Sequence, residues 1–207
     1  MRNFIDRLHK LSVDTYFRCR QNKLAEVAYE VLTAAYCPST PPREKREENI
    51  VKNICNAFSD QKQFYQDVTI YAEKIHGSKS FVKFRNDLSE AKKDHSLVTK
   101  EMADMVVIAI ATENDKILFE KIAFIQNKKE VTSNSVTWVI DQDQLFLLQN
   151  FPNFHGKSGL FYNKNDKDKN YTLHNTYGKL GNYGLFLSPG EMIFANAKLS
   201  LSTRICG

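Results

Sequence analysis

Three side chains in the middle of the chain, Asp104, Gln126 and Lys128, are of types that together could hydrolyse a phosphodiester bond. A carboxylate can hold Mg²⁺, which prefers oxygen ligands and keeps several of its waters. The ion activates a water molecule and neutralises charge on the phosphate. A nearby lysine can orient or deprotonate that water and stabilise the developing negative charge. A carboxylate, an amide oxygen and an ammonium group that meet at one point would therefore suit this chemistry.

Two strands are expected to position these side chains. MVVIAIA (105–111) is almost wholly apolar and rich in β-branched residues, which predicts a buried strand. TENDK (112–116) is typical of a turn. ILFEKIAFIQNKK (117–129) then reads as the antiparallel partner of the first strand. The pattern therefore predicts a central hairpin.

The hairpin fixes which residues meet. In an antiparallel pair the start of one strand lies beside the end of the other, so we expect Asp104 to lie level with residues 124–128. Side chains alternate between the two faces of a strand. Gln126 and Lys128 should therefore point to one face, and Asn127 to the other.

An Asp followed by a strand hairpin and then (Glu/Gln)-x-Lys resembles the PD-(D/E)xK nuclease superfamily, which includes restriction endonucleases, junction resolvases and Mrr-like enzymes. The matching residues are Asp104 and the triplet Gln126-Asn127-Lys128, within residues 99–130 of the 207. The resemblance implies a restriction-endonuclease-like fold and Mg²⁺ (or Mn²⁺) held by Asp104 and Gln126, with the Asn127 backbone carbonyl as a further ligand. It implies a water-activating role for Lys128.

The sequence departs from the superfamily pattern at two positions. Ala103 stands where many members have proline, and Gln126 offers a neutral amide, which is a poorer Mg²⁺ ligand than a carboxylate. Gln at this position also occurs in members that have lost activity. Glu101, three residues before Asp104, could complete the metal site, and Glu130 is a second reserve carboxylate.

The N-terminal part of the chain reads as helical. Apolar spacing predicts helices over residues 3–20, 22–36, 43–75 and 80–93. Members of the superfamily often contribute a glutamate from an N-terminal helix, and Glu26 and Glu30 are the candidates here. Both lie opposite the apolar stripe of their helix, which favours a solvated face.

After the hairpin the chain reads as one helix with short strands. VTWVI (136–140) could form a strand, and Asp141 should cap a helix over 142–150. Strand-like pieces follow: GLFY, YTLH, YGLFLS and EMIFA. We therefore expect an α/β (or α+β) fold with a mixed central sheet. Residues 1–98 would form a helical N-terminal region and residues 99–207 the sheet core, within one compact domain.

Composition sets the broad class. The formal net charge of +5 and the pI of about 8.9 are compatible with binding nucleic acid, although the charge is dispersed. The spacing of the four cysteines predicts reduced thiols and no zinc site. No apolar run is long enough to span a membrane, and no secretory signal is apparent, so a cytoplasmic location is the expectation. His155 and His174 read as loop or strand histidines, whereas His95 lies closer in sequence to the proposed site.

Three functions remain open from the sequence. The first is a metal-dependent endonuclease in restriction or phage defence, with DNA favoured over RNA as the substrate. A homodimer would suit cleavage of two strands. The second is a catalytically inactive nuclease-like module that binds nucleic acid or a protein partner. The third is an interaction protein built on the predicted helix 43–75.

Overall fold

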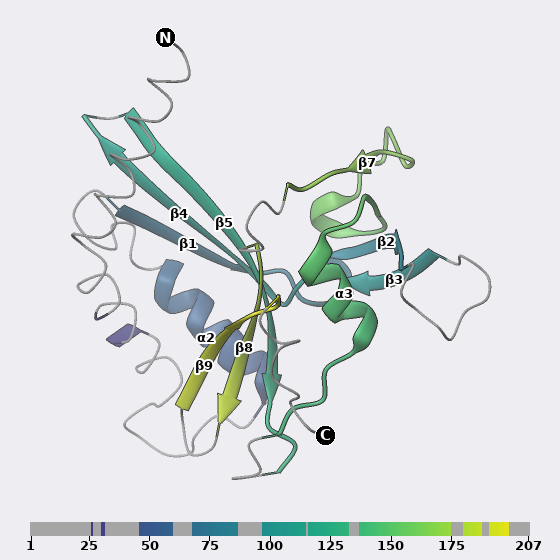
Figure 1. Cartoon of the computed structure of the whole chain (residues 1–207). Coiled ribbons are helices and arrows are strands. Elements are labelled where there is room, and N and C mark those ends of the chain that lie inside the picture. Colours follow the sequence, from purple (N-terminus) through teal and green to yellow (C-terminus); the bar gives the residue numbers. More distant parts are fainter. Residues whose placement is uncertain are drawn as a thin grey trace.

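The computed structural model describes residues 46–59, 68–86, 97–114, 116–132, 137–174, 180–187 and 191–198, with residues 26, 30 and 31. Its central sheet has five strands in the order β1-β4-β5-β8-β9 (Figure 1). These strands are β1 (Val68–Lys74), β4 (Met105–Glu113), β5 (Lys116–Lys129), β8 (Gly181–Leu187) and β9 (Glu191–Asn196). β5 and β8 run parallel, and the other neighbours are antiparallel. The expected α/β class with a mixed central sheet is thus confirmed.

A second, antiparallel sheet has four strands in the order β3-β2-β6-β7. They are β2 (Phe81–Arg85), β3 (Leu97–Glu101), β6 (Phe154–Gly156) and β7 (Asn170–Tyr171). The short 3₁₀ helices η1 (Gly77–Lys79) and η2 (Gly159–Phe161) adjoin it. Val82, Phe84 and Phe154 are fully buried, so one face of this sheet packs into the core.

Two helices cover opposite faces of the central sheet. Helix α2 (Glu47–Ser59) buries Ile50, Val51 and Ile54 in a cluster that contains Met105 and Ile125 of the sheet. Helix α3 (Gln142–Asn150) buries Leu147 and Leu148 in a cluster that contains Val106 and Phe124. Because consecutive strand residues point to opposite faces, the two clusters lie on the two sides of β4 and β5.

The central hairpin is confirmed, and Asp104 lies within the expected level of residues 124–128. The turn is shorter than the predicted 112–116, because β4 extends to Glu113 and β5 begins at Lys116. Met105 lies opposite Ile125, which brings Asp104 level with Gln126. Asn114 in the turn has a φ of 48°, a conformation that asparagine tolerates better than most residues. Asp141 caps α3 as expected, with its side chain accepting a hydrogen bond from Gln144 N.

The predicted helix 43–75 is wrong in its second half. Helix α2 ends at Ser59, and residues 68–74 form strand β1, which pairs along its full length with β4. Val68 and Ala72 are four residues apart, a spacing that suits both a helical stripe and one face of a strand. Pairing with the buried β4 decides between the two, because it satisfies the backbone and buries this face.

The predicted helix 80–93 is also wrong where the structure describes it. Residues 81–85 form β2, in which fully buried Val82 and Phe84 alternate with more exposed neighbours. Residues 137–140 are not a strand, and GLFY (159–162) contains η2 instead. Of the piece YTLH (171–174), only Tyr171 lies in a strand, at the end of β7. β8 and β9 confirm the last two strand-like pieces, YGLFLS and EMIFA.

Several other predictions concern segments of which the structure describes only some residues. Glu26, Glu30 and Val31 are helical, both glutamates are exposed, and Val31 is buried with the α2 cluster. Cys55 is a free, buried thiol whose pKa burial raises to about 11. The predicted helix 3–20, His95 and the other three cysteines lie outside the described residues.

Strands from both sides of the expected boundary at residue 98 build the central sheet, since β1 pairs with β4. β3 itself runs across that boundary, from Leu97 to Glu101. The region before residue 98 therefore contributes strands as well as helix. Among the described helices, none is both long enough and apolar enough to cross a membrane.

Candidate functional site

Asp104 is the centre of a buried polar cluster. It directly precedes β4, and its side chain is almost completely buried, with 2% of the residue exposed. Its Oδ2 accepts hydrogen bonds from Gln126 Nε2 and from the backbone N–H of Asn127, both at 2.6 Å. Its Oδ1 lies 2.8 Å from Nδ1 of His76. The expected meeting of Asp104 and Gln126 is confirmed.

The end of β4 explains why carboxylates gather here. β4 begins at Met105, opposite Ile125. The last residues of β5, from Asn127 to Lys129, therefore have no β4 strand beside them. Two side chains take its place as acceptors: Asp104 Oδ2 receives the N–H of Asn127, and Glu47 Oε2 receives the N–H of Lys129 at 2.9 Å. The first bond satisfies a backbone donor that would otherwise be buried without a partner, and the second pairs a donor at an exposed position.

Glu101 and His76 complete a group of possible metal ligands. Nδ1 of His76 lies 3.3 Å from Glu101 Oε2, while Glu101 Oε1 accepts a hydrogen bond from the backbone N–H of Gly77 at 3.0 Å. His76, Glu101 and Asp104 each offer one ligand atom within 4.8 Å of the other two. The expectation that Glu101 lies beside Asp104 is therefore confirmed.

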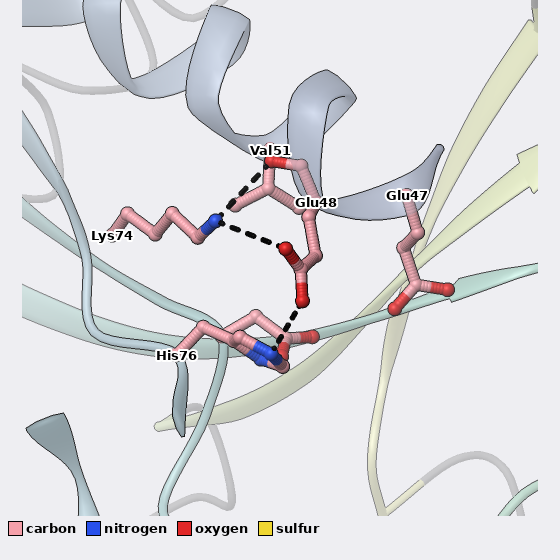
Figure 2. A pocket seen from close by; sticks show the side chains of 6 residues that line it. Glu47, Glu48, Val51, Lys74 and His76 are labelled. Carbon is pink, nitrogen blue, oxygen red and sulfur yellow. Dashed lines mark hydrogen bonds and ion pairs between the residues drawn. The ribbon is translucent and has the colours of Figure 1, made fainter. Parts of the chain in front are cut away.

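The first turn of α2 closes the other side of His76. Glu48 Oε1 lies 3.1 Å from His76 Nε2, and Glu48 Oε2 lies 4.0 Å from the Lys74 ammonium. Figure 2 shows Glu48 descending from the helix between Lys74 and His76, with Glu47 beside it. A small hollow lies among these residues, lined by Glu47, Glu48, Val51, Lys74, His76 and Asp104.

Charges in the cluster act on one another. Partial burial opposes protonation of His76, but the hydrogen bond to Asp104 and the negative charges of Glu101, Asp104 and Glu48 raise its pKa above the ordinary value. Burial and the charge of Asp104 raise the pKa of Glu47, although the Lys129 N–H and Lys128 oppose the shift. The cluster thus carries an excess of negative charge, which favours a cation.

Gln126 offers one free acceptor at this place. Its Nε2 is used by Asp104, whereas its Oε1 is buried and has no hydrogen-bond partner among the described residues. A buried acceptor without a partner costs free energy unless another group satisfies it. An unsatisfied amide oxygen therefore lies on the same side chain that donates a hydrogen bond to Asp104.

The neighbours of Gln126 lie differently. The side chain of Asn127 is buried on the opposite face, against Gly184, and both of its polar atoms lack partners among the described residues. Lys128 is half-buried and makes no ion pair with a described residue. The ligand role of the Asn127 carbonyl and the water-activating role of Lys128 stay predictions.

Glu130 does not belong to the cluster. It lies four residues beyond Gln126 on the same chain, which corresponds to about 13 Å along an extended strand. Its backbone N–H donates to Phe186 O in β8, on the far side from Asp104. His155 lies on β6, and His174 is exposed after β7, so neither reaches Asp104 through a described contact.

Sequence reasoning missed His76, Glu47 and Glu48. His76 was hidden by the predicted helix 43–75. A strand over residues 68–75 would have predicted that Lys74 and His76 point to one face. Antiparallel pairing with the strand that starts at Met105 would then have placed both beside Asp104. The acidic pair at positions 47–48 was visible as the first turn of an amphipathic helix, which is where acidic residues are common for reasons unrelated to catalysis.

Comparisons with family models, curated proteins and solved structures find no match to this chain. The site is therefore interpreted from its own geometry and chemistry. Its distinctive feature is a buried aspartate that joins three separate parts of the chain: the end of β1, the end of β5 and, through His76, the first turn of α2.

Proposed function

We propose that this chain is a metal-dependent nuclease that hydrolyses phosphodiester bonds in DNA and is related to the PD-(D/E)xK enzymes that its sequence resembles. One observation carries the proposal: the ligand atoms of His76, Glu101 and Asp104 converge within 4.8 Å. The hairpin register, which sets Gln126 beside Asp104, supports it.

The donor atoms fit a divalent cation. Two carboxylates supply negative charge, and the unpartnered Gln126 Oε1 supplies a further oxygen. Oxygen donors suit Mg²⁺ and Mn²⁺, while an imidazole nitrogen suits the transition metals better than Mg²⁺. If His76 is a ligand, the set favours Mn²⁺; if only the oxygen atoms bind, Mg²⁺ is equally suitable.

The roles of the protein groups follow from this arrangement. Asp104, Glu101 and His76 would hold the ion, and Gln126 would orient Asp104 through its Nε2. A bound divalent ion lowers the pKa of water and neutralises charge on a phosphate. Lys128 lies on the same face of β5 as Gln126, by strand alternation, where its ammonium could stabilise the negative charge that develops on the phosphate.

A second candidate function rests on the same hydrogen bonds. Both oxygens of Asp104 already have protein partners, which explains its burial without any metal. A carboxylate that caps the N–H of Asn127 could be a purely structural feature. In that case the chain would be a nuclease-like module that binds nucleic acid or a protein partner without cleaving.

A paired assay separates the two candidates. Purified protein is incubated with plasmid, single-stranded DNA and RNA in Mg²⁺ or Mn²⁺, beside the nearly isosteric variant Asp104→Asn. The nuclease proposal expects cleavage by the wild type, loss of about 100-fold or more in the variant, and no cleavage in a chelator. Calorimetric titration with MnCl₂ should show one bound ion for the wild type and none for the variant.

The matched control is Glu120→Gln, which also removes one carboxylate charge but changes an exposed residue of β5 far from the cluster. It should cleave as the wild type does. Folded wild-type protein that binds no ion and cleaves no substrate would refute the nuclease and favour the binding module. Equal cleavage by wild type and Asp104→Asn would place the active site elsewhere.

A further inference from the structure

A basic groove lies on the exposed side of the second sheet, away from the Asp104 cluster. It has a volume of about 370 Å³, and the residues that line it include three lysines, one histidine, one tyrosine and one aspartate. These residues are Lys83, Lys157, Lys167, His155, Tyr162 and Asp168. Three formal positive charges therefore face one negative charge, before any contribution from His155.

The groove lies on the same sheet face as one candidate metal ligand. Lys83 lies directly opposite Thr99 of β3 and His155 of β6, and residues directly paired across strands project to the same face. Alternation along β3 places Leu97, which lines the groove, and Glu101, a candidate metal ligand, on that same face. The other face is buried, as Val82 and Val98 show.

The distance along β3 from the groove residue Leu97 to Glu101 suits a polymer. Leu97 and Glu101 are four residues apart on one strand, which corresponds to about 13 Å. Successive phosphates of one stacked strand are separated by about 3.4 Å along the helix axis. A strand of about four nucleotides would therefore reach from the groove to the ligand cluster.

Tyr162 indicates which form of nucleic acid fits. It follows η2, lines the groove and is 36% exposed, so part of the residue is accessible to a ligand. An accessible aromatic ring beside lysines is the combination that binds unpaired strands, because bases stack on the ring while the cations contact phosphates. Bases inside a duplex are already stacked and paired.

From these observations we propose that the groove binds an unpaired strand of nucleic acid and leads it along β3 toward Glu101 and Asp104. The inference rests on the proposed function for the identity of the polymer. Lys83, Lys157 and Lys167 contact successive phosphates, and Tyr162 stacks on one base. The groove thus confers a preference for single-stranded segments or frayed ends over intact duplex.

The test measures binding without cleavage. Fluorescence anisotropy follows a labelled oligothymidylate, and the same strand in a duplex, over a range of NaCl concentrations with a chelator present. The groove variant combines Lys83→Gln, Lys157→Gln and Lys167→Gln. We expect it to bind the single strand about tenfold or more weakly, with a salt dependence that is shallower by about 2, because each phosphate contact on a single strand contributes about 0.7 to the slope.

The control for total charge combines Lys52→Gln, Lys116→Gln and Lys198→Gln, three exposed lysines on α2, on β5 and after β9. It should retain most of the affinity. Replacing the three groove lysines by arginine should also retain binding, which guards against a folding defect in the glutamine variant. Tyr162→Ala should weaken binding about tenfold, whereas Tyr162→Phe should not.

The outcomes separate this inference from the proposed nuclease. A groove variant that binds like the charge control, or a wild type that binds no oligonucleotide, overturns the inference. Equal affinity for the single strand and the duplex overturns the stated preference. If the protein binds the oligonucleotide through the groove lysines but never cleaves it, the inference about the groove is supported and only the proposed nuclease activity is refuted. If the groove variant cleaves at the rate of the wild type, only the inference about the groove is refuted.

Discussion

Asp104 takes the position beside Asn127 that a neighbouring strand would otherwise occupy, and its Oδ2 receives the Asn127 N–H at 2.6 Å. The carboxylate is therefore both a structural acceptor and the centre of the candidate metal site. A structural acceptor contributes the same stability with or without a divalent ion. A metal ligand makes the stability depend on the concentration of that ion, and this difference can be measured.

The first prediction is that Mn²⁺ stabilises the wild-type protein and does not stabilise Asp104→Asn. Free ion at 100 times its dissociation constant should add about 2.7 kcal/mol to the free energy of unfolding, since it binds only the folded state. Thermal and urea unfolding across a MnCl₂ series measure the increment. The control Glu120→Gln should show the same increment as the wild type, and an equal increment in Asp104→Asn would contradict the assignment.

The hairpin illustrates what the sequence could predict. The apolar runs on either side of residues 112–116 predict two paired strands, which places Asp104 level with residues 124–128. The exact partner, Gln126, depends on a register shift between Ala111 and Thr112 that the apolar pattern does not predict. Asp141 before an apolar segment likewise fixes the start of α3. In these segments the local pattern and the tertiary environment favour the same structure, so the pattern is sufficient.

β1 illustrates what the sequence could not predict. Residues 68–74 become a strand because β4 lies beside them, and that neighbour is more than thirty positions away along the chain. The spacing of Val68, Ala72 and Ile75 fits a helix equally well. This ambiguity concealed His76, and with it the nitrogen donor of the candidate metal site. Glu101 was found because it is close to Asp104 in the sequence itself.

The second prediction concerns the carboxylate that caps α3. Partial burial opposes ionisation of Asp141, but hydrogen bonds from Lys100 and Gln144 hold its pKa below the ordinary value of 3.8. The stabilisation is therefore fully present above about pH 4 and is lost as the pH falls through the lowered folded-state pKa. Asp141→Ala should reduce the free energy of unfolding at pH 7 by about 1 kcal/mol.

Asp141→Asn serves as the matched comparison, because asparagine caps a helix about as well as aspartate but cannot pair with Lys100. It should cost only the exposed ion pair, about 0.2–1 kcal/mol. Urea unfolding at pH 7 and pH 3 measures both variants. The free-energy advantage of the wild type over Asp141→Asn should be smaller at pH 3 than at pH 7. An advantage that grew in acid would show that the sign of the pKa shift is wrong.

The third prediction tests the packing of Asn127 against β8. A methyl group at Gly184 would overlap Asn127 Oδ1 and lie 3.2 Å from Met192 Cε. Gly184→Ala should therefore destabilise the protein by about 1–3 kcal/mol. Combining it with Asn127→Ala should recover part of that loss, because the clashing atom is removed. A double-mutant cycle from urea unfolding gives the coupling.

Gly181→Ala provides the contrast. A methyl group there would overlap the backbone of Leu148 in α3, which no single side-chain substitution can remove. It should cost more than Gly184→Ala and show no coupling to Asn127→Ala. If both glycine variants show equal coupling free energies with Asn127→Ala, the side chain of Asn127 does not pack against Gly184.

The fourth prediction concerns the choice of metal. His76 supplies the nitrogen donor of the cluster and is held by Glu48 on one side and Asp104 on the other. His76→Gln replaces that nitrogen donor with an amide, so Mn²⁺ affinity should fall by about tenfold or more while Mg²⁺ affinity changes little, because Mg²⁺ is bound by oxygen atoms. Calorimetric titrations with each ion provide the two affinities. His174→Gln, at an exposed position after β7, should alter neither. Equal losses for both ions would mean that His76 acts by orienting Asp104 rather than by binding the ion, and unchanged affinities would remove His76 from the site.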